Sequence, residues 1–213
     1  MSVTIDEILV GDPREAWEAA GFAVDGDGTC RIGSVRVRLM GRDGGKRILG
    51  WSLRGAPPAR LADGSLDGLP TTDSDEPPAA PATHPNGATH IDHVVLLSPD
   101  LARTTAALET IGLASRGERV SDTYGAPMRQ VFFRLGEVIL ELVGQPDTAG
   151  EGDPGFFGLA ITVADLDAAG ALLGEHLGTA KDAVQEGRRI ATLRHREVGM
   201  SVATALMSPE PHP

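Results

Sequence analysis

Short runs of apolar residues, each of strand length, recur along the chain and are each followed by the start of a helix. These runs cover residues 5–10, 91–97 and 159–163. The next residues are Asp12-Pro13, Ser98-Pro99-Asp100 and Asp165, which are types that cap a helix or suit its first turn. Apolar residues then recur at helical spacing until a glycine ends the pattern. The pattern predicts three units of one strand and one helix.

Each predicted helix is followed by further strand candidates. They cover residues 22–24, 34–39 and 48–53 in the first unit, 113–120, 128–135 and 138–143 in the middle unit, and 188–193 and 201–206 in the last. The order strand, helix, strand, strand, strand is a βαβββ module, which predicts the α+β fold class. The first strands of two units also align by letter, with Ile5-Asp6-Glu7-Ile8 against Ile91-Asp92-His93-Val94.

The first unit is separated from the other two by a segment rich in proline and acidic residues. Seven of the fifteen prolines lie between residues 57 and 88, and the segment has no hydrophobic period. We therefore expect an extended, solvated tether over 57–88, between a module at 1–56 and a domain at 89–209. That domain divides into modules at 89–146 and 154–209, and the short link between them favours their pairing. The tether permits the first module to pack on an edge or to pair with its copy in a homodimer.

Composition limits the partners. Nineteen basic residues against thirty acidic ones give a net charge of −11, which argues against nucleic acid. The lone Cys30 fits a reducing compartment. No apolar run approaches the roughly 20 residues that a membrane helix needs, and the first residues lack a signal-peptide pattern. The expectation is a cytoplasmic protein with no membrane partner.

The middle and last units resemble a known family. The segments that carry the resemblance are Ile91-Asp92-His93-Val94-Val95-Leu96, Pro99-Asp100-Leu101, Val138-Ile139-Leu140-Glu141-Leu142 and Ala160-Ile161-Thr162-Val163-Ala164-Asp165-Leu166-Asp167. They resemble the vicinal oxygen chelate superfamily, which includes glyoxalases, bleomycin-resistance proteins, epimerases and extradiol dioxygenases. The resemblance implies two paired βαβββ modules around a cleft that takes a small molecule. It also implies a divalent ion such as Zn, Ni, Mn or Fe, held from the first and fourth strands of each module.

The resemblance assigns metal ligands in the middle module only. His93 stands at the ligand position of its first strand and Glu141 at that of its fourth strand. The equivalent positions of the last module are Gly158 and Thr204, or Ala203 if the register slips by one residue. The expected ligand set is therefore incomplete. Glu7 would supply a third ligand only if the first module paired with the middle one.

Neighbouring residues suggest how a substrate would be held. Glu141 lies between Leu140 and Leu142, so its carboxylate is expected to face a wet cleft, where it would act as a catalytic base if no metal is present. If the hairpin at Gly136 pairs in register, Phe132 lies opposite Glu141 and shares its face with Gln130 and Arg134. A bulge would instead exchange Phe132 with Phe133. Tyr124 either caps the cleft or covers the sheet, and one of Arg188 and Arg189 either reaches the cleft mouth or is solvated.

Two classes of function remain. The first is an enzyme of the lyase, isomerase or dioxygenase type, with an ion on His93 and Glu141 or with Glu141 moving a proton. The second is a metal-free binder that sequesters a small molecule, as bleomycin-resistance proteins do. The incomplete ligand set favours a binder or an altered enzyme over a standard glyoxalase.

Overall fold

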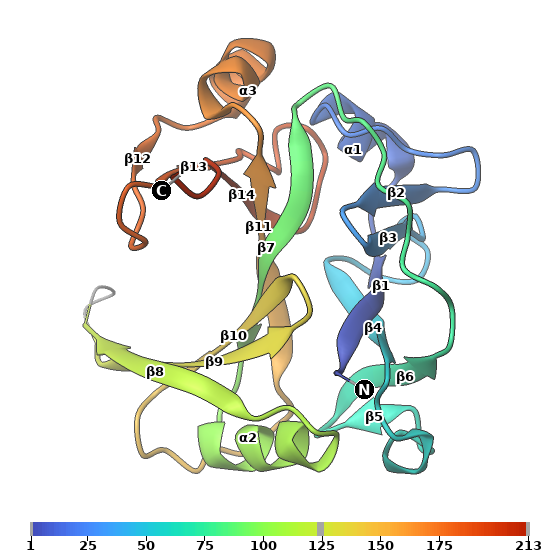
Figure 1. Cartoon of the computed structure of the whole chain (residues 1–213), viewed down its shortest axis with the longest axis vertical. Coiled ribbons are helices and arrows are strands. Elements are labelled where there is room, and N and C mark those ends of the chain that lie inside the picture. Colours follow the sequence, from blue (N-terminus) through green and yellow to red (C-terminus); the bar gives the residue numbers. More distant parts are fainter. Residues whose placement is uncertain (1, 123–125, 212–213) are drawn as a thin grey trace.

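The computed structural model describes residues 2–122 and 126–211. It has the α+β class expected from the sequence, with two mixed β-sheets side by side and a few short helices (Figure 1). Tyr124 lies outside the described residues. Among the helices described, none is long and apolar enough to cross a membrane.

The C-terminal sheet has eight strands in the order β12-β13-β14-β11-β7-β10-β9-β8. Its elements are β7 (Ala88–Leu97), α2 (Leu101–Thr110), β8 (Ser115–Ser121), β9 (Met128–Leu135), β10 (Val138–Gly144), β11 (Gly155–Val163), α3 (Leu166–Leu173), η2 (Gly174–His176), β12 (Lys181–Asp182), β13 (Arg189–Thr192) and β14 (Ala203–Met207). The strands β7 and β11 pair antiparallel at the centre, and each has the last strand of its own module parallel beside it. This is the expected pairing of two βαβββ modules.

The helices begin where capping residues predict. The Asp100 side chain accepts a hydrogen bond from the Arg103 backbone at the start of α2, and Asp165 does the same for Asp167 and Ala168 at the start of α3. Both helices lie outside the curve of the sheet, whose two ends bend toward the same side (Figure 1). The concave face of the C-terminal sheet is therefore not covered by these helices.

The N-terminal sheet repeats this pairing scheme in six strands, in the order β2-β3-β1-β4-β6-β5. Its elements are β1 (Thr4–Val10), α1 (Arg14–Ala19), β2 (Thr29–Ile32), β3 (Val35–Leu39), β4 (Ile48–Arg54), η1 (Pro58–Arg60), β5 (Ser65–Leu66) and β6 (Leu69–Ser74). The central pair β1 and β4 is antiparallel, β3 lies parallel to β1, and β6 lies parallel to β4. It is therefore built like a shortened pair of modules, and the strand expected at residues 22–24 is replaced by β2.

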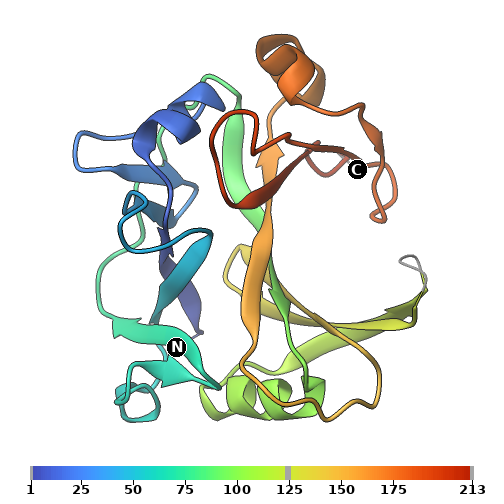
Figure 2. The ribbon, with the colours of Figure 1, turned by 180° about the vertical axis from the view of Figure 1, so that it is seen from behind.

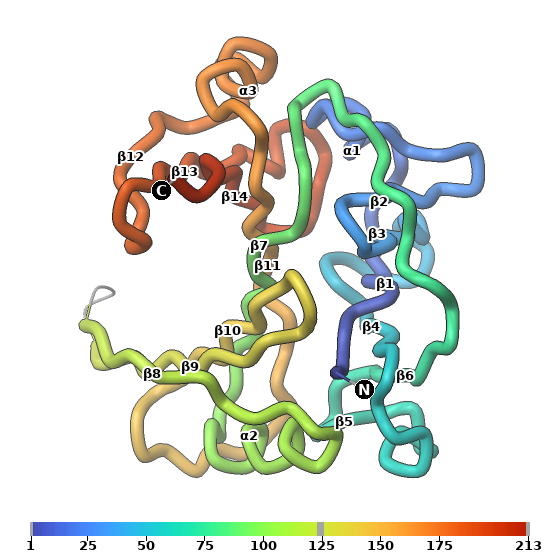
Figure 3. The backbone as a smooth tube through the Cα atoms, in the orientation of Figure 1, coloured from blue at the N-terminus to red at the C-terminus, as the bar shows by residue number. Residues whose placement is uncertain are grey.

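The expectation of a solvated tether over residues 57–88 differs from the structure. Within this segment β6 pairs with β4, and β5 pairs with β6. Residues 75–87 then run along the N-terminal sheet, where Ala82 donates to the Arg31 carbonyl and the His84 ring accepts from the Ala23 amide (Figure 3). The few buried residues of β6, Leu69 and Thr71, are spaced among proline and polar residues, so the sequence shows no apolar run there.

The N-terminal sheet packs against the β7 and β11 pair of the same chain (Figure 2). Trp51 of β4 lies edge-on to Phe156 of β11, with ring centroids 5.1 Å apart. Glu137, in the turn before β10, accepts hydrogen bonds of 2.7 Å from both the amide and the hydroxyl of Ser34. The first module thus covers the side of the central strands that faces away from the concave face.

Within the C-terminal sheet β11 and β14 approach closely at Gly158. A side chain there would bring its Cβ closer than 3.0 Å to the Ala203 carbonyl oxygen, whereas a Cβ at Gly155 would meet nothing within 4 Å. We expect Gly158→Ala to lower the free energy of unfolding by about 1–3 kcal/mol because one strand must shift. Urea unfolding of Gly158→Ala measures this loss, and Gly155→Ala in the same strand is the matched control. Equal stability of the two variants would contradict the close approach.

Candidate functional site

A bulge in β7 brings two polar side chains together in an otherwise apolar strand. Ile91 pairs with Ile161 and His93 pairs with Ala160, so Asp92 is an extra residue in the ladder. A bulge of this kind redirects the side chains of the residues around it. As a result Asp92 and His93 are neighbours in space as well as in sequence, and their side chains are hydrogen-bonded.

His93 lies between two carboxylates. Its Nδ1 is 3.0 Å from Asp92 Oδ1, and its Nε2 is 3.6 Å from Glu141 Oε2 on β10. The His93 and Glu141 side chains are 16% and 15% exposed, so both reach solvent. The 3.6 Å separation is longer than a hydrogen bond, which leaves these two polar atoms facing each other without direct contact.

Asp92 is held by partners from the last module. Arg188, whose side chain is 5% exposed, places Nη2 2.7 Å from Asp92 Oδ2, and Thr162 donates to the same oxygen at 3.1 Å. Burial alone would raise the pKa of Asp92, but hydrogen bonds from His93 and Arg188 hold it well below its usual range. An ionised carboxylate only accepts hydrogen bonds, so His93 donates its Nδ1 proton to Asp92.

Glu141 is held from the other side by β9 and β8. Gln130 donates from Nε2 to Glu141 Oε1, and Arg119 of β8 donates to Gln130 Oε1 at 2.7 Å. The β9–β10 hairpin has the expected register, with Phe132 opposite Glu141. Phe133 is 1% exposed on the opposite face and Arg134 is exposed. The alternative in which the two phenylalanines exchange faces is therefore wrong.

The last module supplies no equivalent of these polar groups. Since His93 pairs with Ala160 and Val95 pairs with Gly158, Gly158 takes the place of His93 in the last module. The parallel pairs beside them, Ile139 with His93 and Ala203 with Gly158, place Ala205 at the position of Glu141. Thr204 was the expected position, but its side chain is 3% exposed and donates to the Val202 carbonyl.

The donors present do not make a complete metal site. The described residues contain no group of three or more His, Cys, Asp or Glu side chains placed to hold an ion. Glu7 does not join His93, because it is bound to Arg38 Nε at 2.6 Å in the N-terminal sheet. Catalytic zinc sites use three protein ligands, and His93 with Glu141 gives two. The divalent ion implied by the resemblance therefore stays a prediction.

The N-terminal sheet contains the same bulge without the same site. Asp6 is the extra residue between Ile5 and Glu7 in β1, and its buried carboxylate is paired with Arg36 and Arg54. The positions of His93 and Glu141 are taken in that sheet by Glu7 and Arg38, which form an ion pair. The bulged aspartate with its arginine is thus a feature of both sheets, whereas the His93–Glu141 pair occurs in the C-terminal sheet.

Sequence reasoning missed Asp92 and Arg119 as parts of the site. The signal for Asp92 was present, since Asp6 and Asp92 occupy the same place in the aligned first strands. Arg188 was one of two arginines considered; it is buried against Asp92, while Arg189 is exposed and paired with Asp167. Arg119 carried no signal, because its role depends on the pairing of β8 with β9.

No family model matches the sequence, and no curated protein matches it. Solved structures do match. A mutant of 4-hydroxymandelate synthase from Streptomyces coelicolor gives a TM-score of 0.66 at 15% identity, over 100% of this chain and 94% of that one. The match to catechol 2,3-dioxygenase has a TM-score of 0.61 at 14% identity, and it covers 99% of this chain and 95% of that one. The match to methylmalonyl-CoA epimerase from Mycobacterium tuberculosis has a TM-score of 0.46 at 23% identity, and it covers 59% of this chain and 91% of that one.

The 4-hydroxymandelate synthase and the catechol 2,3-dioxygenase are members of the vicinal oxygen chelate superfamily, and their match confirms the fold expected for residues 89–209. The chain has the fold of this superfamily. The two matches with the higher TM-scores span essentially the whole chain, so the likeness also includes the N-terminal sheet. At these identities the likeness concerns the fold and not the reaction.

The Asp92–Arg188 pair is expected to be a main source of stability at the site. Asp92→Asn leaves Arg188 buried without its charge partner and should lower the free energy of unfolding by about 3 kcal/mol. The folded-state pKa of Asp92 lies below its unfolded value, so its contribution is present above about pH 4 and declines as the pH falls further. The loss in Asp92→Asn should therefore shrink in acid.

Urea unfolding at pH 7 and pH 3 measures this loss. The matched control is Asp167→Asn, which removes the carboxylate of the exposed Arg189 pair and should leave stability nearly unchanged. If both variants lost the same small amount of stability at pH 7, the Arg188 pair would not be a stabilising buried contact.

Proposed function

We propose that the concave face of the C-terminal sheet binds a small organic molecule, and that His93 and Glu141 move a proton on it. The observation that carries this proposal is the facing pair of Nε2 and Oε2, 3.6 Å apart and partly exposed. A base must lie within hydrogen-bond reach of the proton it takes, directly or through one water. A substrate atom beside the line that joins Nε2 and Oε2, about 3 Å from each, would lie within reach of both.

The hydrogen bonds around His93 and Glu141 indicate a different role for each residue. Asp92 accepts the Nδ1 proton of His93, which directs Nε2 toward Glu141. Gln130 occupies Glu141 Oε1, so Oε2 is the oxygen turned to His93. Glu141 then takes a proton from the substrate, and protonated His93 returns one to it from Nε2. After product leaves, Glu141 passes its proton to His93 Nε2, directly or through one water, which restores the carboxylate and the imidazolium. The Asp92 carboxylate stabilises the imidazolium in the meantime, as the orienting carboxylate of a catalytic triad does.

This scheme favours an isomerase or epimerase. A proton leaves one carbon and a proton returns to the same or a neighbouring carbon, so no electrons are exchanged and no co-reactant is consumed. The two donors fall short of a complete metal site, and the scheme has no step that requires one. Proton transfer of this kind contributes typically 10²–10⁴-fold to a rate.

The two halves of the concave face offer different contacts to a substrate. The middle module presents Phe132, partly exposed opposite Glu141, and the exposed Arg134 two residues further along β9. In the last module β11 and β14 carry only small residues at the positions that match His93, Val95, Ile139 and Glu141. They are Gly158, Ala160, Ala203 and Ala205. This contrast supports a substrate with an apolar body on the glycine and alanine side. Its polar or anionic group would lie toward Arg134.

The reaction is tested by hydrogen exchange on carbonyl compounds. A panel of 2-oxo carboxylates, 2-hydroxy carboxylates and α-substituted thioesters is incubated with the protein in D₂O, and proton NMR follows deuterium uptake next to the carbonyl. We expect uptake in at least one compound, and a loss of at least about 100-fold in Glu141→Gln and in His93→Gln. Glu109→Gln, on the exposed surface of α2, is the matched control and should keep the wild-type rate.

The other outcomes discriminate between the remaining functions. If a compound binds saturably without hydrogen exchange, and Phe132→Ala weakens its binding, the protein sequesters a small molecule and does not catalyse proton transfer. Exchange that requires added Zn, Ni, Mn or Fe, and fails in both site variants, would assign His93 and Glu141 to a metal. Exchange that continues unchanged in both variants would contradict any role for the pair.

A further inference from the structure

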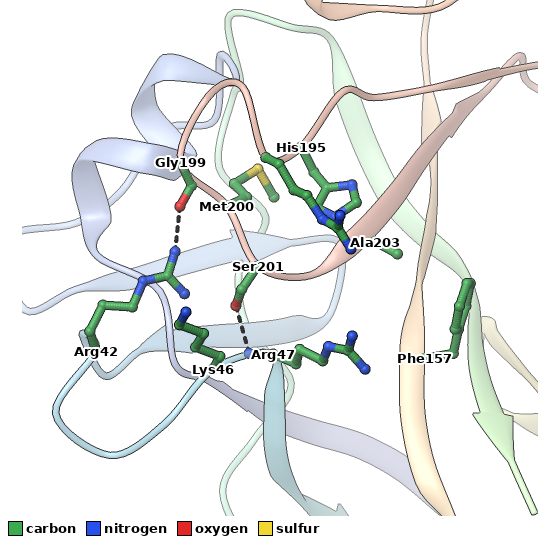
Figure 4. Close-up of a pocket in the computed structure, with 10 residues that line it drawn as sticks. Arg42, Lys46, Arg47, Phe157, His195, Gly199, Met200, Ser201 and Ala203 are labelled. Carbon is green, nitrogen blue, oxygen red and sulfur yellow. Dashed lines mark hydrogen bonds between the residues drawn. The ribbon is translucent and has the colours of Figure 1, made fainter.

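A pocket lies away from His93 and Glu141, at the junction of the two sheets. It measures about 540 Å³ and is formed by the loop between β3 and β4 and the loop between β13 and β14, with Phe157 of β11 at one side (Figure 4). The residues that line it include Arg42, Lys46, Arg47, Phe157, His195 and Arg196. Its volume is in the range of small-molecule sites.

The lining is strongly basic although the chain is acidic. Four of the 19 Lys and Arg residues line this one pocket, no Asp or Glu does, and the net charge of the chain is −11. Arg42 is neutralised by Asp12 at 2.6 Å. Among the described residues, Lys46, Arg47 and Arg196 make no ion pair. Such a concentration of one charge in a concave site attracts anions.

The pocket is built on a buried carboxylate. Asp12 is 0% exposed and accepts hydrogen bonds from Arg42 Nη1, from the Ser201 amide and hydroxyl, and from Trp17 Nε1 at 3.1 Å. Arg42 also donates to the Gly199 carbonyl. Asp12 and Arg42 thus link the β3–β4 loop to the β13–β14 loop through hydrogen bonds. These bonds hold in place the two loops that carry the basic side chains.

Arg47 has an unusual backbone conformation. Its φ is 66°, in the left-handed region that residues other than glycine rarely adopt. Hydrogen bonds fix it there, from the Arg47 amide to Ser201 Oγ at 2.6 Å and from the Gly11 amide to the Arg47 carbonyl at 2.8 Å. In Figure 4 the Arg47 guanidinium is directed across the pocket toward Phe157. Residues held in such conformations cluster at ligand sites.

An exposed aromatic side chain lies beside the cations. Phe157 is 50% exposed, and the register shift between Phe156 and Gly158 leaves it as the extra residue of β11. Phe157 and Arg47 also line a second cavity of about 430 Å³, together with Leu97, which is 42% exposed. The two cavities therefore meet at Arg47 and Phe157. The carboxylates Glu151 and Asp153 also line the second cavity, so the cations are concentrated in the first one.

The positive surroundings also act on the histidine of the pocket. Burial lowers the pKa of His195, and Arg196 and Arg47 lower it further, although the Leu193 carbonyl and Asp12 act in the opposite direction. Burial is the main cause of this shift, and the two arginines add to it as positive charges close to the His195 ring.

We propose that this pocket binds the di- or triphosphate group of a small molecule. Arginine guanidinium groups and lysine ammonium groups both bind phosphate oxygens. The three cations without an ion pair, Lys46, Arg47 and Arg196, favour a ligand with several negative charges close together. The size of the pocket and the acidity of the remaining chain disfavour a long polyanion. Free polyphosphate and a nucleoside polyphosphate share this chemistry, and they differ in whether a base can lie against Phe157.

The test is isothermal titration calorimetry with tripolyphosphate, ATP and AMP in buffer containing EDTA and 0.1 M salt. The wild-type protein should bind tripolyphosphate and ATP and bind AMP at least 10-fold more weakly. Arg47→Asn, which removes the charge but tolerates the left-handed backbone, and Arg196→Gln should each weaken ATP binding about 10-fold. Arg60→Gln, exposed in η1, and Glu141→Gln should bind like the wild type, with thermal unfolding as the check on folding.

The two sources are distinguished by Phe157→Ala. ATP binding that is tighter than tripolyphosphate binding and falls in this variant identifies a nucleoside polyphosphate. Equal binding of both ligands, unchanged by the substitution, identifies polyphosphate alone. No binding of either ligand to the wild type would overturn the proposal. So would binding that is the same in Arg47→Asn, Arg196→Gln and Arg60→Gln.

Discussion

The antiparallel pairing of β7 with β11 is the interaction on which the rest of the structure depends. It joins the two C-terminal modules, each of which has its last strand parallel to its own first strand, and β11 packs against Trp51 of the N-terminal sheet. The bulge at Asp92 belongs to this pairing, so the orientation of His93 follows from the ladder. Arg188 then reaches from the last module to Asp92, which makes the site a product of both modules.

The chain contains its own comparison for the candidate site. Both sheets have a central antiparallel pair with a parallel strand on each side of it, and both have a buried, bulged aspartate bound by arginine. They differ at the two positions beside it, where the N-terminal sheet has the Glu7–Arg38 ion pair and the C-terminal sheet has His93 facing Glu141. The Glu7–Arg38 ion pair occupies both of its members, whereas His93 Nε2 and Glu141 Oε2, 3.6 Å apart, are not in direct contact with each other. This difference, on one scaffold, is why we place function in the C-terminal sheet.

The sequence predicted what depends on local pattern and missed what depends on pairing across long distances. Apolar runs and capping residues predicted β7, α2, β9, β10 and β11. The turn at Gly136 predicted the register in which Phe132 lies opposite Glu141. Strand β6 was hidden because few of its residues are buried, and residues 57–88 were expected to be a tether. The Thr204 position was one residue off because only the β11–β14 ladder fixes it. The basic pocket joins loops about 150 residues apart, and nothing in either loop alone predicts it.

The central claim is that Asp92 directs the Nδ1 proton of His93 and so turns Nε2 toward Glu141. Long-range proton–nitrogen NMR of the imidazole rings measures this directly, because it reports which nitrogen of a neutral histidine carries the proton. The signal of His93 is identified among the six histidines by its loss in His93→Gln. The account predicts that neutral His93 is protonated on Nδ1. A neutral ring protonated on Nε2, with Nδ1 bare beside Asp92, would contradict it.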